Sequence, residues 1–202
     1  TWTRRSAIAS SAASLLGLPS VLRAALTIDG APRALRVLFL GGTGFIGPHM
    51  VRRALERGHR VTLFTRGRSG TDLFPDVERL IGDRRGQLDA LKGKTWDVVI
   101  DNSGYVPADV SDSVALLRAS VGHYLYTSTI DAYRDFHTAN IDESYPLASL
   151  PPGTPHDTQK YYGPLKALCE QAVADGMSGR FTVVRPGWVA GPGDNNHLFT
   201  YW

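Results

Sequence analysis

Residues 36–47 read Arg-Val-Leu-Phe-Leu-Gly-Gly-Thr-Gly-Phe-Ile-Gly, and this stretch decides the fold of the chain. Residues 37–40 form a short apolar run, which is typical of a strand buried in a parallel sheet. The glycine cluster then opens a segment, 49–57, in which apolar residues recur at helical spacing. A strand, a tight turn and a helix follow one another directly, which predicts the first unit of an α/β fold.

Each glycine of the turn has a physical role in this interpretation. Gly41 permits the sharp exit from the strand, Gly44 lets the backbone approach a pyrophosphate, and Gly47 lets the helix pack closely on the sheet. The phosphates would meet free N–H groups at the positive end of the helix. Because the turn follows a strand and precedes a helix, it predicts a dinucleotide site. The alternative is an ordinary turn that binds nothing.

The second predicted strand, 61–65, indicates which dinucleotide is bound. In such folds an acidic side chain at the end of this strand binds the ribose hydroxyls of NAD. Here Arg66 closes the strand and Arg68 follows it. Two guanidinium groups suit a 2′-phosphate better than a diol, so we expect NADP in preference to NAD. A solvated arginine pair is the alternative.

Composition limits the other classes of function. The chain has 202 residues, a hydrophobic fraction of 43% and a formal charge of +3, which suits one globular domain. Its arginines are scattered and no lysine-rich tract occurs, so nucleic-acid binding gains little support. The single cysteine, Cys169, excludes an internal disulfide. The histidines lack the spacing of a zinc site, and no metal is expected.

The first 30 residues resemble an export signal. An arginine pair, Arg4-Arg5, precedes an uncharged stretch rich in Ala, Ser and Leu, 7–22, and small residues follow it. This order resembles a bacterial twin-arginine signal, so we expect export to the periplasm through the twin-arginine machinery. The stretch is too short and too weakly apolar to span a membrane. A frayed N-terminal helix on a cytoplasmic protein is the alternative.

The remaining chain alternates strand and helix patterns. This alternation predicts a doubly wound parallel sheet, a Rossmann-type domain over residues 34–194, with ligands beyond the carboxyl ends of the strands. The polar segment 138–155 is expected to be a loop on the active-site side. The predicted strands are 36–40, 61–65, 77–81, 96–101, 123–127 and 180–185, and the clearest helices are 106–120 and 158–175.

Small polar residues close three of the predicted strands. They are Gly82-Asp83, the run from Asp101 to Gly104, and the run from Thr127 to Thr129. Such residues can hydrogen-bond the adenine, ribose and nicotinamide groups of a dinucleotide. Each alone could be an ordinary strand-to-loop turn, and their shared position favours a site.

Tyr162 and Lys166 form a candidate reactive pair. Residues four apart lie on one face of a helix, so the phenol and the ammonium can point at one place. A nearby ammonium would lower the pKa of the tyrosine toward a range useful for acid/base catalysis. Pro164 lies between them and predicts a kink. An unrelated Tyr and Lys on a surface helix is the alternative.

These residues together resemble the extended short-chain dehydrogenase/reductases, also called the NAD-dependent epimerase/dehydratase family. The resemblance implies that Tyr162 is the general acid/base, that Lys166 holds the nicotinamide ribose and tunes Tyr162, and that Thr129 lies beside the substrate oxygen. The matching motifs are Gly41-Gly-Thr-Gly-Phe-Ile-Gly47, Gly82-Asp83, Thr127-Ser-Thr-Ile-Asp-Ala-Tyr133, Tyr162-Gly-Pro-Leu-Lys166 and Arg185-Pro-Gly-Trp-Val-Ala-Gly-Pro-Gly-Asp194.

The resemblance also implies reversible hydride transfer between a nicotinamide and a carbinol or carbonyl carbon. The substrate implied is a small molecule, a sugar or nucleotide sugar, with oxidation, epimerisation and dehydration all open as net reactions. The implied cofactor contacts are Gly41, Thr43, Gly44, Phe45, Ile46, Gly47, Arg66, Arg68, Asp83, Asn102, Ser103, Gly104, Tyr162, Lys166 and Gly187.

Two departures from the family pattern stand out. Arg134 replaces the glycine that usually follows the tyrosine at position 133, so the wall near the substrate is expected to differ. Family members continue past the Gly-Pro-Gly-Asp motif into a smaller substrate-binding domain, and residues 195–202 are expected to begin that region. A homodimer stays open.

Two other classes of function also stay open. Residues 36–68 resemble the atypical branch that includes chloroplast stem-loop-binding proteins, in which the same fold binds RNA. That function needs a basic face with exposed aromatic residues, and the sequence concentrates neither. A module that binds NADP without turnover is the third alternative.

Overall fold

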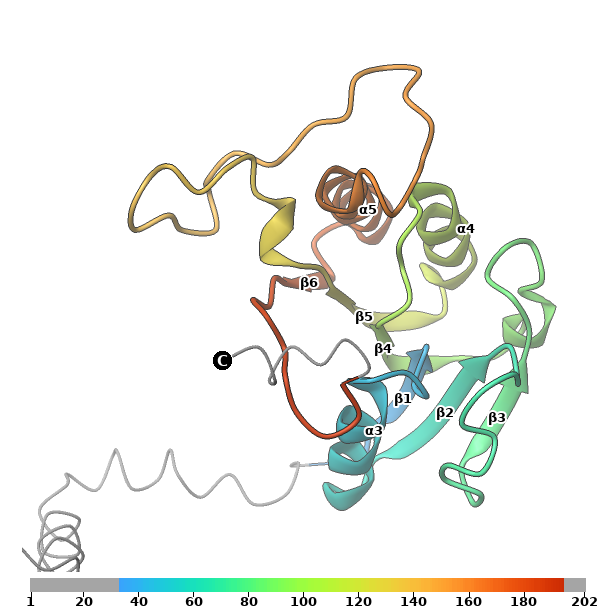
Figure 1. Cartoon of the computed structure of the whole chain (residues 1–202). Coiled ribbons are helices and arrows are strands. Elements are labelled where there is room, and N and C mark those ends of the chain that lie inside the picture. Colours follow the sequence, from blue (N-terminus) through green and yellow to red (C-terminus); the bar gives the residue numbers. More distant parts are fainter. Residues whose placement is uncertain (1–32, 195–202) are drawn as a thin grey trace, which may run out of the picture. The chain divides into compact units, whose positions relative to one another are not determined.

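The computed structural model describes residues 33–194. Six strands form one parallel sheet in the order β3-β2-β1-β4-β5-β6 (Figure 1). The order reverses between β1 and β4, which is where ligands bind in doubly wound sheets. The predicted fold class is therefore confirmed. The strands are β1 (Arg36–Leu40), β2 (Arg60–Thr65), β3 (Glu78–Ile81), β4 (Trp96–Asp101), β5 (Val121–Thr127) and β6 (Phe181–Val184).

Helices cover both faces of the sheet (Figure 1). The helix α3 (Gly47–Glu56) lies on one face, and α4 (Pro107–Leu117) and α5 (Tyr162–Met177) lie on the other. Neighbouring side chains of β1 alternate between the two faces. Val37 and Phe39 join the core beneath α3, whereas Leu38 and Leu40 join the core beneath α4 and α5. This double burial explains why the strand is a continuous apolar run.

Two connections between strands contain no α-helix. Residues 66–77 and 82–95 form turns and one short 3-10 helix, η2 (Asp89–Leu91). The simple alternation of strand and helix does not extend to these segments. Gly67, Gly70 and Pro75 interrupt the first connection, and such residues favour turns over helices.

The kink predicted at Pro164 is absent. The helix α5 begins at Tyr162, so the proline occupies the third helical position. The first four N–H groups of a helix have no partner within the helix, and a proline there removes no helical hydrogen bond. The helix runs on to Met177 without interruption.

The polar segment 138–155 folds back onto the residues after β5. Tyr133 and Leu147 form an antiparallel bridge, and the backbone N–H of Ala148 donates to the carbonyl of Ala132 at 2.8 Å. Glu143 and Leu147 line a hollow beside Arg185 that is separate from the cleft described below. None of the residues of this segment lines the cleft described below, and its predicted place on the active-site side stays a prediction.

Several sequence predictions concern residues beyond 33–194. The export signal at 1–30 and the beginning of a further region at 195–202 both lie outside the described residues. Between residues 33 and 194, no helix combines the length and apolar character needed to cross a membrane.

Candidate active site

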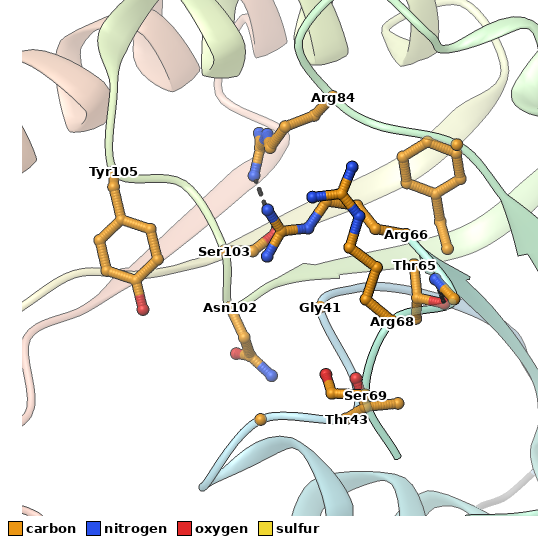
Figure 2. A pocket seen from close by; sticks show the side chains of 14 residues that line it. Gly41, Thr43, Thr65, Arg66, Arg68, Ser69, Arg84, Asn102, Ser103 and Tyr105 are labelled. Carbon is orange, nitrogen blue, oxygen red and sulfur yellow. Dashed lines mark hydrogen bonds between the residues drawn. The ribbon is translucent and has the colours of Figure 1, made fainter. Parts of the chain in front are cut away.

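Two adjoining hollows at the carboxyl ends of the strands form one cleft. The first has a volume of about 230 Å³ and lies between the glycine turn and the end of β2, as Figure 2 shows. The second has a volume of about 450 Å³ and lies beside the start of α5. A ligand that fills both would pass the residues lining both, which are Gly41, Gly44, Asn102 and Tyr105.

The glycine turn has the geometry of a phosphate site. Gly41 has a φ of 86°, in the left-handed region that favours glycine. A Cβ atom placed on Gly44 would meet no atom within 4 Å, so this backbone faces open space. No side chain caps the start of α3, and its first turn carries no acidic residue. The turn therefore fits the pyrophosphate of a dinucleotide.

Gly47 has a different role from the one predicted. A Cβ atom there would lie 2.6 Å from the carbonyl carbon of Gly42. The close approach that requires a glycine is thus between the helix start and the turn itself, not between the helix and the sheet. Thr43 lines the first hollow, and Phe45 and Ile46 line the second.

Both predicted arginines line the first hollow. The side chains of Arg66 and Arg68 reach into it from the segment after β2 (Figure 2). Asp83 is not among the residues lining the hollow, although its neighbours Gly82 and Arg84 are. Its carboxylate instead accepts a hydrogen bond from the backbone N–H of Arg85 at 3.1 Å. The structure does not bring Asp83 to the site as the sequence predicted.

A buried ion pair that the sequence did not indicate lies behind this hollow. Arg84 donates to both carboxylate oxygens of Asp101, at 2.7 and 2.9 Å. Burial opposes both charges, yet each ion favours the other's charged form, so the pKa of Asp101 is lowered and that of Arg84 is raised. The phenol of Tyr124 also donates to Asp101, at 2.8 Å. The available signal was an arginine three residues after one strand and an aspartate at the end of the next.

The three predicted catalytic residues meet in the second hollow. Thr129, Tyr162 and Lys166 all line it, and so does Gly187. Tyr162 and Lys166 lie one turn apart near the start of α5, and Thr129 follows β5. Thr129 also caps the short helix η3 (Ile130–Ala132), because its hydroxyl accepts from the backbone N–H of Asp131.

Burial raises the pKa of the Tyr162 phenol above its ordinary value. Tyr105 and Asp131 raise it further, and a hydrogen bond with Thr129 acts in the opposite direction. The predicted lowering of the Tyr162 pKa by Lys166 is therefore wrong. The phenol is neutral at pH 7 and can act as a proton donor.

The ammonium group of Lys166 is held by backbone carbonyls. It donates to the carbonyl of Gly104 at 2.8 Å and to that of Thr127 at 2.6 Å. Burial lowers the pKa of Lys166 to about 8. Gly104 thus lies behind the cleft and contributes its carbonyl, whereas Asn102 and Ser103 line the cleft.

A second buried ion pair stabilises the strand end that carries Thr129. Glu170 lies on α5 one turn beyond Lys166, and its carboxylate accepts from the guanidinium of Arg185 at 2.7 Å. The buried hydroxyl of Ser128 donates to the same carboxylate. Among residues 33–194, no cluster of His, Cys, Asp or Glu has the form of a metal site.

Comparisons with known proteins identify the family of this chain. The model of the NAD dependent epimerase/dehydratase family matches residues 37–202. The chain belongs to this family. It is 30% identical over 185 residues to a 2-alkyl-3-oxoalkanoate reductase of Stenotrophomonas maltophilia, covering 79% of this chain and 52% of that protein. It is 31% identical over 114 residues to the chloroplast stem-loop binding protein of 41 kDa b of Arabidopsis thaliana, covering 48% and 30%.

Solved structures share the fold at lower identity. Yeast methylglyoxal/isovaleraldehyde reductase Gre2, complexed with NADPH, matches with a TM-score of 0.63 and 19% identity. The match covers 78% of this chain and 59% of that one. The Bordetella bronchiseptica enzyme WbmG in complex with NAD has a TM-score of 0.59 and 16% identity, over 76% and 53%. The chain thus spans about half of the length of such proteins.

Proposed function

We propose that this protein transfers hydride between NADP and a carbinol or carbonyl carbon of a small molecule. The observation that carries the proposal is the single cleft, which joins the glycine turn to Thr129, Tyr162 and Lys166. When bound, the nicotinamide supplies or accepts the hydride. Membership of the family supports a nicotinamide cofactor and an enzyme of this general type.

The residues of the second hollow supply the proton chemistry. In reduction, the neutral phenol of Tyr162 donates its proton to the substrate oxygen, and the Thr129 hydroxyl hydrogen-bonds that oxygen. The cationic Lys166 holds the ribose next to the nicotinamide and favours the phenolate left after proton transfer. The proposed substrate is a sugar or nucleotide sugar. The fold shared with a UDP-galactose 4-epimerase and the exposed ring of Trp188 at the hollow support this class.

The preference for NADP rests on Arg66 and Arg68. Both guanidinium groups face the first hollow, where a 2′-phosphate would supply two negative charges for them. The dissociation constants of NADPH and NADH test this preference in the parent protein and in Arg66→Ala. Equal affinity for both cofactors in the parent would contradict it.

Tyr162→Phe tests the catalytic part of the proposal, and Tyr161→Phe is the matched control. Loss of the acid/base group is expected to lower kcat by at least about 100-fold while NADPH binding is retained. Tyr161 is not among the residues that line the cleft, so Tyr161→Phe should keep its activity. A panel of nucleotide sugars, sugars and 3-oxoalkanoates provides the substrates. Full turnover by Tyr162→Phe would exclude the proposed role.

RNA binding is a second candidate because of the likeness to the stem-loop binding protein. Tight, salt-sensitive binding of a stem-loop RNA without turnover on the substrate panel would favour it. NADP binding with neither turnover nor RNA binding would favour a cofactor-binding module.

We also propose export through the twin-arginine route, on the sequence of residues 1–30. A reporter fused to these residues should be translocated, and changing Arg4 and Arg5 to lysine should stop translocation. Retention of the unchanged fusion in the cytoplasm would overturn this proposal. A folded export route would suit a protein that acquires its dinucleotide before crossing the membrane.

A further inference from the structure

The segment 66–73, which follows β2, forms one wall of the first hollow. Arg66 and Arg68 reach into the hollow from it, as Figure 2 shows. Residues 66–73 form turns rather than a helix or a strand, so no regular ladder of backbone hydrogen bonds holds them in place. The positions of the two guanidinium groups therefore depend on what the rest of the segment contacts.

Arg79 holds the far end of this segment from β3. Its Nη2 atom donates to the carbonyl of Gly70 at 3.2 Å and to that of Leu73 at 2.8 Å. The backbone N–H of Leu73 also donates to the carbonyl of Gly70, at 3.3 Å, which closes the chain into a turn. A single side chain of the sheet thus binds both ends of this turn.

The same turn lies against the glycine turn after β1. A Cβ atom placed on Gly70 would lie 3.0 Å from the Cβ of Thr43, which lines the first hollow. Phe74 follows the turn with a φ of 56°, a conformation that is rare for a bulky residue, and its side chain packs on the core beneath α3. Such a conformation persists only where the surroundings hold it, so the segment is fixed at its far end as well as at β2.

Arg79 itself is not part of the hollow, because it is not among the residues that line it. Among residues 33–194, the carbonyls of Gly70 and Leu73 are the hydrogen-bond partners of its side chain, and its buried Nη1 atom has none. A methionine at this position would remove the two bonds together with the buried donor that lacks a partner. The sheet is therefore expected to tolerate the change.

We propose that Arg79 is a positioning residue for cofactor selectivity, which holds the segment 66–73 so that Arg66 and Arg68 face the place of the 2′-phosphate. The inference rests on the proposed function, because it presupposes the preference for NADP. A segment ordered before binding avoids part of the entropy cost of ordering it in the complex. NAD lacks the phosphate that the two guanidinium groups would meet, so the effect of Arg79 should fall on NADP.

Arg79→Met tests the positioning role, and Arg52→Met is its matched control, because Arg52 is exposed on α3 and does not line the hollow. Circular dichroism first establishes that both variants fold. In fluorescence titration, the Kd for NADPH should be about tenfold higher in Arg79→Met, and the Kd for NADH should stay within about twofold of the parent. A general loss of packing would not change the ratio of the two constants. Arg52→Met should match the parent for both cofactors.

Two further variants separate the bonds to the carbonyls from the size of the side chain. Arg79→Lys keeps donor groups at the end of a long side chain, so its Kd for NADPH should stay within about threefold of the parent. Arg79→Gln is polar but shorter, so it is expected to lose the bonds and to behave like Arg79→Met. It also replaces Arg79→Met if the methionine prevents folding.

Hydrogen exchange gives a readout that needs no cofactor. In Arg79→Met, the backbone amides of residues 66–73 should exchange at least about tenfold faster than in the parent, because the turn can open while the sheet stays folded. The amides of β1 should exchange as they do in the parent. Arg52→Met should leave both segments unchanged.

The outcomes separate this inference from the proposed function. Unchanged affinity for NADPH in Arg79→Met, equal losses for NADPH and NADH, or unchanged exchange at residues 66–73 would overturn the inference alone. A parent protein that binds NADPH and NADH equally would overturn the proposed preference for NADP, and one that binds neither would overturn the proposed function. The inference falls with either of these two results.

Discussion

The side chain of Lys166 is charged although the residue is only 2% exposed, and this lowers the stability of the fold. Burial disfavours the ammonium group, so the folded protein releases its proton at about pH 8, below the ordinary pKa of 10.5. The carbonyls of Gly104 and Thr127 compensate for only part of the lost hydration. The fold thus pays some stability to keep the ammonium group that we propose binds the ribose.

The pH dependence of unfolding should report this shift. Between about pH 8 and 10.5 the unfolded chain binds more protons at Lys166 than the folded chain does. The free energy of unfolding therefore rises with pH in this window. Below pH 8 both states are protonated and the contribution is constant. In urea unfolding, the free energy of unfolding of the parent should rise across this window by about 1–3 kcal/mol more than that of Lys166→Met.

The exposed Lys160 offers the control for this titration. Lys160→Met should show the same pH profile as the parent, because it leaves the buried ammonium group of Lys166 in place. Parallel profiles for the parent and Lys166→Met would show that the buried ammonium keeps its ordinary pKa.

Gly44 is expected to matter for cofactor binding but not for folding. A methyl group at this position meets no protein atom within 4 Å, so Gly44→Ala should change the free energy of unfolding by no more than about 0.5 kcal/mol. The same methyl group enters the space proposed for the pyrophosphate. The dissociation constant of NADPH should therefore rise at least about tenfold, as measured by fluorescence titration. Unchanged affinity would place the phosphates elsewhere.

At the scale of the elements, α5 links the cleft to the strand ends. Its residues Tyr162, Lys166 and Glu170 follow one another at intervals of four and so share one face. The sequence predicted the first two as a pair because their spacing alone places them together. It could not predict that Lys166 turns to two carbonyls, because those acceptors come from β5 and from the loop after β4.

The pairing of Glu170 with Arg185 should be costly to break. Arg185→Met leaves a carboxylate that is 4% exposed without its guanidinium partner, which should destabilise the protein by about 3–5 kcal/mol in urea unfolding. Changing Glu170 to Met as well removes the unpaired charge, so the double variant should be more stable than Arg185→Met.

A solvent-exposed ion pair provides the comparison. Arg53 and Glu56 pair at 3.4 Å with both side chains more than half exposed, so Arg53→Met should cost less than about 1 kcal/mol. Equal effects of Arg185→Met and Arg53→Met would show that the buried pair contributes no more than a surface pair.

At the scale of the molecule, local patterns predicted the strands and three helices. Burial on both faces gives a strand an uninterrupted apolar run, and the helices show apolar residues at helical spacing. The end of β1 matches its predicted position, Leu40, since the glycine turn marks it. The Arg84–Asp101 pair could not be predicted in this way. Asp101 ends β4 and Arg84 lies in the loop after β3, and only the sheet order places β3 and β4 on either side of β1 and β2.

The cleft gathers residues from β2, β5 and α5 and from the turns after β1 and β4, so cofactor binding should stabilise the whole domain rather than one segment. At a concentration of 100 times its Kd, NADPH should add about 2.7 kcal/mol to the free energy of unfolding. For a domain of this size, that corresponds to a rise in Tm of about 5–10 °C in a thermal melt. Gly44→Ala is the control, because its lower affinity should leave a smaller rise at the same concentration. Identical melts with and without NADPH would mean that the cleft does not bind this cofactor, whatever the geometry of its glycine turn.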